Sequence, residues 1–250
     1  MKNFNDASNA HALRTSAATN FKSSERQGAT AVPSLLKRAA IFDMDGTLVD
    51  TLADLYDSVN EMLAHYNLPL RTLDEVRQFV GNGARKLMIR SLPADCDFVD
   101  EALDYYNGCY ARNCLKKVKP YDGIIEFLTA LEAKKIPLGI CTNKQHFAAV
   151  EIAEKILAPI KFSYVSGDEP GQPRKPDPTR ALAGAKKFSV APEDVAYFGD
   201  TAVDIQTAIN AGFLPIGVTW GFRPKSELED SGAKIIVDHP NEILEQINFG

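Results

Sequence analysis

Two aspartates one residue apart, Asp43 and Asp45, follow the apolar run Ala39–Phe42 and precede Gly46 and Thr47. An apolar run that ends at polar residues and a glycine is typical of a buried strand. Two carboxylates at such a strand end repel each other and are costly to desolvate. A bound cation would relieve both problems, and hard divalent cations prefer oxygen ligands. An isolated Asp-x-Asp is more often a cap or turn, so the preceding strand is what favours a cation site.

Further along the chain, polar residues follow two other apolar runs. Thr142 comes after a strand predicted at Ile136–Cys141, and Asp200 after one predicted at about 195–199. In open α/β sheets, sites form beyond the carboxyl ends of the strands. The Thr142 hydroxyl and the N–H groups of the next helix could hold an anion there, although a plain helix cap better explains a lone threonine. A third carboxylate at Asp200 strengthens the prediction of a cation.

Two more charged residues could take part in the same chemistry. Lys175 lies in a proline-rich segment, and an ammonium near a phosphate neutralises the charge that spreads onto its oxygens during transfer. Taken alone, such a lysine is more often a solvated surface residue. Asp204 comes four residues after Asp200, on the same helix face if a helix begins there. It could touch a metal, orient Asp200 or favour the helix N-terminus.

The segments that must position these residues show two different patterns of predicted secondary structure. Between residues 54 and 118, apolar residues recur at helical spacing without a convincing strand, and Thr72 with Glu75 forms a plausible capping box. From residue 120 onward, helices alternate with strands, which predicts a parallel sheet covered on both faces. We therefore expect an α/β fold: a doubly wound, Rossmann-like core at 38–53 and 119–250, with a small helical cap inserted at 54–118. The expected helices lie at about 124–131, 146–157, 179–188 and 202–211, and the later strands at about 162–165, 214–218 and 235–237.

Composition limits the kinds of partner that we expect. The chain has 250 residues, of which 45% are hydrophobic and 24% charged, and its net charge of −5 argues against a nucleic-acid or anionic-membrane partner. The four cysteines show no Cys-x-x-Cys pairing, so a zinc site or disulfide framework is disfavoured and a reducing cytoplasm is expected. Residues 1–37 lack periodicity and are predicted to be a disordered tail, with an organelle transit peptide as the alternative.

Taken in order, the motifs Asp-x-Asp-Gly-Thr, Thr-Asn, Lys-Pro and Gly-Asp-x-x-x-Asp resemble the four signatures of the haloacid-dehalogenase-like (HAD) phosphohydrolases. The resemblance runs from about Ala39 to the C-terminus. Three further segments are similar to the phosphoglycolate phosphatase branch of this family, which has a small helical cap where 54–118 lies. These segments are Val80–Ala84, Thr142–Lys144 and Thr219–Arg223.

The resemblance implies a role for each matching residue. Asp43 would be the nucleophile that becomes an aspartyl-phosphate, and Asp45 would protonate the leaving alcohol and then activate water. Thr142 and Lys175 would grip the phosphoryl group. The Mg²⁺ cofactor would be held by Asp43, the carbonyl oxygen of Asp45 and Asp200, with Asp204 in support. Gly46, Thr47 and Asn143 would contact the substrate.

The cap contributes the remaining predicted substrate contacts. In the family, the loop that corresponds to Gly81, Asn82 and Gly83 faces the substrate, and its glycines could bring backbone N–H groups close. A simple helix break explains any one of these residues equally well. Arg85, in the first turn of the next predicted helix, could pair with a substrate carboxylate or could equally be a solvated helix residue.

The leading hypothesis is a Mg²⁺-dependent phosphatase of a small phosphorylated metabolite, with 2-phosphoglycolate as the favoured substrate. A phosphosugar mutase or phosphosugar phosphatase of the same superfamily is the alternative. A dehalogenase is disfavoured, because that branch typically lacks an acid where Asp45 stands. A non-enzymatic regulator that binds a phosphorylated metabolite is also weighed, but every expected catalytic residue is present. We expect no nucleic-acid or membrane partner, and a monomer or a homodimer.

Overall fold

The computed structural model describes residues 36–250, which lie within one compact unit. The predictions of a disordered tail or a transit peptide therefore fall on residues outside the described range, except at the tail's end. There the prediction is wrong, because Leu36–Lys37 form strand β1, which pairs in parallel with β10 at Asn248–Phe249. The last two residues of the predicted tail thus belong to the folded core.

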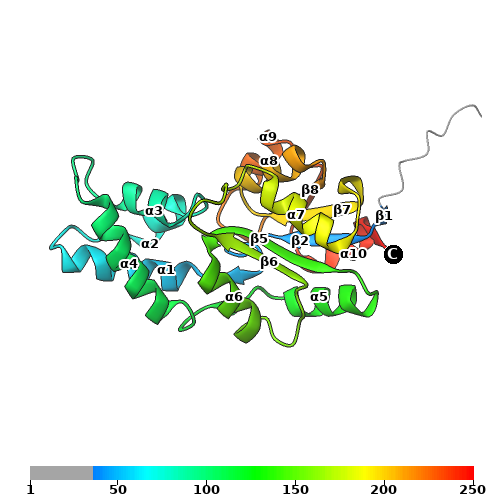
Figure 1. The fold of residues 1–250 in the computed structure, drawn as a ribbon, viewed down its shortest axis with the longest axis horizontal. Coiled ribbons are helices and arrows are strands. Elements are labelled where there is room, and N and C mark those ends of the chain that lie inside the picture. Colours follow the sequence, from blue (N-terminus) through cyan, green and yellow to red (C-terminus); the bar gives the residue numbers. More distant parts are fainter. Residues whose placement is uncertain (1–35) are drawn as a thin grey trace, which may run out of the picture. The chain divides into compact units, whose positions relative to one another are not determined.

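A six-stranded, entirely parallel sheet forms the centre of the molecule, in the order β6-β5-β2-β7-β8-β9 (Figure 1). All of β2 is buried, as expected for a strand in the middle of a covered parallel sheet. The predicted doubly wound α/β fold is therefore confirmed. The strands are β2 (Ala39–Phe42), β5 (Leu138–Gln145), β6 (Tyr164–Asp168), β7 (Val195–Gly199), β8 (Leu214–Val218) and β9 (Ile235–Val237).

Helices cover both faces of this sheet, and the alternation along β2 shows which residues meet which helices. Ala40 and Phe42 pack in one cluster with α5 (Ile124–Ala133) and α6 (His146–Lys155). Ala39 and Ile41 pack in another with α7 (Thr179–Phe188) and α8 (Ala202–Ala211). Successive side chains of a strand point to opposite faces, so one short strand anchors both layers. Shorter elements complete the core: η1 (Pro192–Asp194), α9 (Lys225–Asp230), η2 (Pro240–Glu242) and α10 (Ile243–Gln246).

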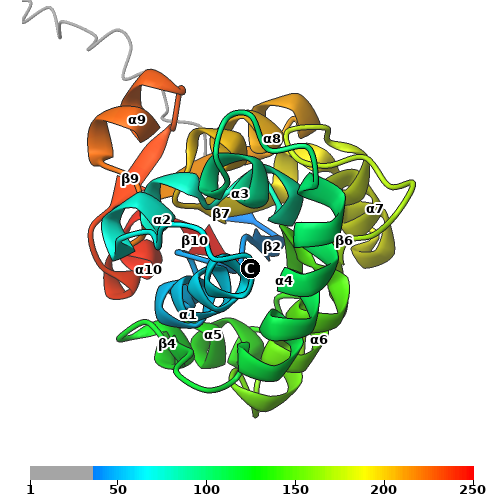
Figure 2. The same ribbon diagram turned by 90° about the vertical axis from the view of Figure 1, so that its left-hand side faces the viewer.

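Four helices lie beyond the end of β2 that carries Asp43 (Figures 1 and 2). They share a buried cluster of their own, with Met62, Val76, Met88 and Tyr106 among its members. The predicted Thr72–Glu75 capping box is present at the start of the second helix. The helices are α1 (Leu52–His65), α2 (Leu73–Phe79), α3 (Ala84–Ser91) and α4 (Val99–Asn113), and the antiparallel pair β3 (Val49–Asp50) and β4 (Lys119–Pro120) flanks them in the chain.

Two strands differ from their predicted ranges. β5 begins two residues later than predicted and continues to Gln145, with a register shift against β6 after Cys141. The polar segment Thr142–Lys144 is buried inside this strand, so the hydrophobic pattern on which the prediction rested could not reveal it. β6 likewise runs to Asp168 instead of ending near residue 165. In both cases backbone pairing, not hydrophobicity, extends the strand.

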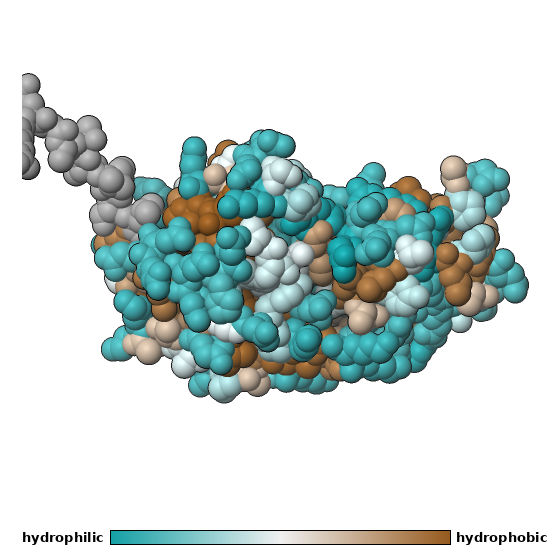
Figure 3. Space-filling model, turned by 180° about the vertical axis from the view of Figure 1, so that it is seen from behind, coloured by the Kyte–Doolittle hydropathy of each residue, from teal (hydrophilic) through white to brown (hydrophobic). Residues whose placement is uncertain are grey.

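The surface in Figure 3 is mostly hydrophilic, with hydrophobic residues in separate patches. Within the described range, no helix is both long and apolar enough to span a membrane.

Candidate active site

The carboxyl ends of β2 and β7 bring Asp43 and Asp200 to one edge of the sheet, and the second half of β5 brings Thr142 beside them. These strands are neighbours, and the Asp43 N–H continues the ladder by donating to the Phe198 carbonyl at 2.9 Å. Residues that lie about 60 to 160 positions apart in the chain are thereby placed together. The site forms where sites of open parallel sheets are expected.

Three carboxylates form a buried cluster at this edge. Asp43, Asp200 and Asp204 each contribute one oxygen, and these oxygens lie within 4.8 Å of one another. Burial raises the pKa of Asp200 well above its usual value, and the charges of Asp204 and Asp43 raise it further. Burial, followed by the charge of Asp43, raises the pKa of Asp204 to about 6. The three buried carboxylates therefore repel one another, and the cluster needs positive charge nearby to offset this repulsion.

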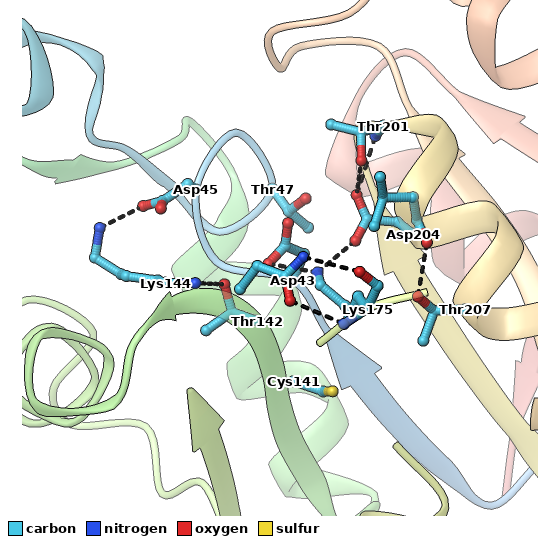
Figure 4. A network of polar contacts seen from close by, with 12 residues as sticks. Asp43, Asp45, Thr47, Cys141, Thr142, Lys144, Lys175, Thr201, Asp204 and Thr207 are labelled. Carbon is cyan, nitrogen blue, oxygen red and sulfur yellow. Dashed lines mark hydrogen bonds and ion pairs between the residues drawn. The ribbon is translucent and has the colours of Figure 1, made fainter. Parts of the chain in front are cut away.

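Lys175 is the cation that faces this cluster (Figure 4). Its fully buried ammonium donates to Asp204 Oδ1 at 2.6 Å and lies 2.9 Å from Asp43 Oδ1. Burial lowers the Lys175 pKa, but Asp204 and Asp43 more than offset this, so the pKa is raised and the lysine stays charged. The contact with Asp43 lacks hydrogen-bond geometry, and this buried oxygen has no hydrogen-bond donor among the described residues.

These residues fit a divalent cation. Lys175 pairs with two of the three carboxylates, Asp43 and Asp204, and one buried carboxylate oxygen lacks a donor, so both charge and ligand oxygens are available. The backbone is also packed closely around Asp200: a Cβ at Gly46 (φ +80°) would lie 2.3 Å from Asp200 Oδ2. Gly46 is thus required for close approach to a predicted metal ligand. Its predicted contact with substrate, and the metal contact of the Asp45 carbonyl oxygen, remain predictions.

The Asp45 carboxylate points away from the cluster, toward the cap (Figure 4). It accepts hydrogen bonds from Lys144 Nζ and from the Thr51 hydroxyl, both at 2.7 Å. Thr47 lies on the opposite side, where its hydroxyl approaches Asp200 Oδ1 at 3.5 Å. The Asp45 carboxylate is thus directed away from the three-carboxylate cluster, whereas the Thr47 hydroxyl is directed at it.

Asn143 has a structural role that the sequence did not predict. Its amide donates to the carbonyl oxygens of Gly81 at 3.4 Å and Lys175 at 3.2 Å. Its Oδ1 accepts from the Lys175 N–H at 2.9 Å and from Arg180 at 3.0 Å. Because both amide protons are used by the protein, Asn143 positions Lys175 and the cap loop, and no amide proton is left for a substrate.

The predicted cap residues divide into two groups. Gly81 and Gly83, both at positive φ, line the cavity beside Asp43 and Asp45. Asn82 accepts a hydrogen bond from Arg90 at 2.8 Å, and the half-exposed Arg85 pairs with Asp100 at 3.0 Å. Neither Asn82 nor Arg85 lines the cavity. Arg85 lies on the outer face of α3, whose inner face buries Leu87 and Met88. Its position therefore matches the alternative prediction of a solvated helix residue.

The cavity has a volume of about 40 Å³ and combines the acidic edge of the sheet with an apolar wall from the cap. Thr142 lines it from β5, and two buried tyrosines line it from α4. Its lining residues are Asp43, Asp45, Leu55, Val80, Gly81, Gly83, Ala84, Leu87, Tyr106, Tyr110, Thr142, Asn143, Lys144, Gln145, Thr201 and Phe222.

Sequence reasoning missed two arginines that organise the loops of the site. Arg180, nearly fully buried, donates to the carbonyl oxygens of Thr142, Gly167 and Pro173. Arg223 donates to backbone carbonyls at the end of α2, including Val80 at 2.6 Å. Arginine is common on surfaces, so nothing in the sequence marked these positions, except that Arg223 ends a segment typical of the phosphoglycolate phosphatase branch.

Residues 40–218 match the family model described as haloacid dehalogenase-like hydrolase, and the chain belongs to this family. A hydrolase of the same family from Streptococcus pneumoniae has a similar structure, with a TM-score of 0.76 at 26% identity over 84% of this chain and 98% of that one. The predicted family is therefore confirmed together with the fold.

The curated relatives are phosphatases, which confirms the prediction of a phosphoric monoester hydrolase. The chain is 36% identical to a phosphoglycolate phosphatase of Agrobacterium fabrum, over 78% of this chain and 86% of the relative. It is 32% identical to an N-acetylmuramic acid 6-phosphate phosphatase of Pseudomonas aeruginosa, over 84% and 95% of the two chains. Relatives at similar identity thus act on two different phosphate esters.

Proposed function

We propose that this protein is a Mg²⁺-dependent phosphatase that hydrolyses a small phosphomonoester through an aspartyl-phosphate. One observation carries the proposal: Asp43 belongs both to the buried carboxylate cluster and to the lining of the cavity. A nucleophile in this position can face a phosphate on one side and cationic charge on the other. When bound, Mg²⁺ would offset the repulsion between the Asp43 carboxylate and a phosphate dianion.

The chain's own residues can carry out both half-reactions. An Asp43 oxygen attacks phosphorus, and the bond from phosphorus to the leaving-group oxygen breaks. Protonated Asp45 gives its proton to that oxygen, so the alcohol leaves neutral. Ionised Asp45 then takes a proton from the water that attacks the aspartyl-phosphate, which releases phosphate and restores Asp43. Lys175, beside Asp43, stabilises the charge that develops on the phosphoryl oxygens.

Cavity size favours 2-phosphoglycolate over the larger of the two esters that the relatives' names describe. A single water needs about 10–15 Å³ of such a cavity, so 40 Å³ holds about three or four water-sized groups and is small for any phosphomonoester. The cavity must therefore widen least for the ester with the smallest leaving group, and the glycolate group is several times smaller than an N-acetylated sugar acid. We therefore propose 2-phosphoglycolate as the substrate.

The test is phosphate release from a panel of phosphorylated metabolites, with and without Mg²⁺, by the wild type and by Asp43→Asn. We expect 2-phosphoglycolate to be the best substrate, chelator to abolish turnover, and the variant to be inactive but folded, because an amide is not a nucleophile. Normal turnover by Asp43→Asn would disprove the covalent mechanism. Faster turnover of sugar phosphates would disprove the substrate assignment, and phosphoryl transfer within a sugar phosphate would indicate a mutase.

A further inference from the structure

Lys144 occupies a place in the cavity that the proposed reaction does not explain. Within the described part of the chain, it is the only basic residue among those lining the cavity, which also include the two acidic residues Asp43 and Asp45. Its side chain is 2% exposed, so its charge acts at close range and with little screening. A phosphorylated substrate adds further negative charge to this space. The position of the Lys144 ammonium therefore affects which anionic groups of a substrate this cavity can bind.

Two of the three ammonium protons of Lys144 have partners. Its Nζ donates to Asp45 Oδ1 at 2.7 Å and to the Tyr110 hydroxyl, and lies 4.7 Å from the centre of the Tyr110 ring. An ammonium has three donors, so one remains for a further acceptor. Asp45 of the core and Tyr110 of the cap thus hold the Lys144 ammonium in place, and its third N–H can donate to a bound ligand.

The wall around Lys144 would exclude an anion without such a donor. Tyr106 and Tyr110 are stacked, with ring centres 5.7 Å apart, and burial raises the pKa of both hydroxyls well above the usual value. Both tyrosines therefore stay neutral, and Leu55 and Leu87 add apolar surface nearby. Burying an anion against such a surface is costly unless a cation pairs with it.

We propose that Lys144 binds the carboxylate of the substrate's leaving group and so selects phosphomonoesters that carry an anionic group a few atoms from phosphorus. The proposal rests on the proposed phosphatase function of the same cavity. It transfers to Lys144 the role expected for Arg85, whose guanidinium is paired with Asp100 outside the cavity. Tyr110 is then a positioning residue, since its hydroxyl holds the ammonium from the cap side.

A competing role for Lys144 is to act only through Asp45. Removal of the lysine would then slow every substrate alike, because Asp45 serves every leaving group. A carboxylate-binding role predicts a selective loss instead. The comparison therefore needs two esters of nearly the same shape, 2-phosphoglycolate and its amide 2-phosphoglycolamide, in which an anionic carboxylate is replaced by a neutral amide.

The experiment measures kcat/KM for both esters in the wild type, Lys144→Gln and Tyr110→Phe, with Lys155→Gln as the control. Lys155 is an exposed lysine of α6 paired with Glu151, so its loss removes an equal charge outside the site. We expect Lys144→Gln to lower the preference for the acid over the amide by about 10- to 100-fold, the effect of losing one hydrogen bond to a charged group. Tyr110→Phe should lower it less, and Lys155→Gln should leave it unchanged.

Binding measurements separate this proposal from the proposed reaction. In an Asp43→Asn background, the Kd of 2-phosphoglycolate should rise by a similar factor when Lys144→Gln is added, and the Kd of the amide should change little. Equal losses for acid and amide in both assays, or a wild type that prefers the amide, would overturn the role of Lys144. Selective binding without phosphate release from any ester by the wild type would instead overturn the proposed function and leave the Lys144 assignment standing.

Discussion

Replacing Asp200 with asparagine should stabilise the metal-free protein and at the same time remove its response to Mg²⁺. The carboxylate is fully buried, and its oxygens lie near those of Asp43 and Asp204. An asparagine carbonyl can keep the hydrogen bond that Asp200 Oδ2 accepts from the Phe222 N–H at 2.7 Å. The substitution therefore removes charge from the cluster while keeping shape and the main contact.

The size of the effect follows from the spacing of the charges. Two unit charges 4.8 Å apart repel by about 3–4 kcal/mol at an effective dielectric constant of about 20. Lys175 already offsets part of this repulsion, and burying the amide of the new asparagine away from water costs some stability. We therefore expect a net gain of about 1–3 kcal/mol in the free energy of unfolding without metal. With Mg²⁺ at about 100 times its Kd, the wild type should gain about 2.7 kcal/mol, which the variant should largely lack.

The assay is urea unfolding of the wild type and Asp200→Asn in chelator and in Mg²⁺, with Asp95→Asn, a change at an exposed aspartate, as the control. The pH dependence gives a second signature. Because the pKa of Asp200 is raised in the folded state, that state holds the proton more tightly than the unfolded state does. Metal-free wild-type stability should therefore fall as pH rises above about 3.8, more steeply than that of the variant.

The reasoning would be refuted if Asp200→Asn were less stable than the wild type in chelator, or if Mg²⁺ stabilised both proteins equally. The first result would mean that the cluster is not electrostatically strained. The second would mean that Asp200 does not contribute to a metal site.

Two further predictions concern the links between cap and core. Arg223→Gln should speed hydrogen exchange of the backbone amides in the last turn of α2 by about 10- to 100-fold, because the guanidinium donates to the carbonyl oxygens that end this helix. Unchanged exchange rates would show that this contact does not stabilise the helix end. Asp54→Asn should lower the free energy of unfolding by about 1–3 kcal/mol, measured in urea, since its buried carboxylate accepts the N–H groups of Lys117 and Val118, where the chain returns from the cap. A loss below about 0.5 kcal/mol would contradict a structural role for this carboxylate.

Local sequence was sufficient to predict the architecture of the core. The alternation of helices and strands determines a parallel sheet, and polar residues directly after apolar runs mark its carboxyl edge. Asp43 and Asp200 could therefore be placed side by side before any coordinates were known. The register of β2 against β5 and β7 then brings these ends into contact, as the structure shows.

Strand ends alone did not determine which way each side chain turns. Asp43 and Asp45 are separated by one residue, yet one faces the carboxylate cluster and the other faces Lys144. The turn through Gly46, with its positive φ, and the packing of Asp200 against it decide this difference. Such a turn is visible in the sequence, but its direction depends on the neighbour against which it packs.

What the sequence by itself determined is therefore the fold class, the family and the positions along the chain whose side chains gather at the edge of the sheet, because these depend on local periodicity and motif order. Only the tertiary structure decided which residues face the cavity. Tyr110 of α4 accepts a hydrogen bond from Lys144 of β5, and Arg85 forms an ion pair with Asp100 instead of lining the cavity. Helical periodicity shows that a residue lies on a buried or an exposed face, but its partner there is chosen by contacts between segments distant in the chain.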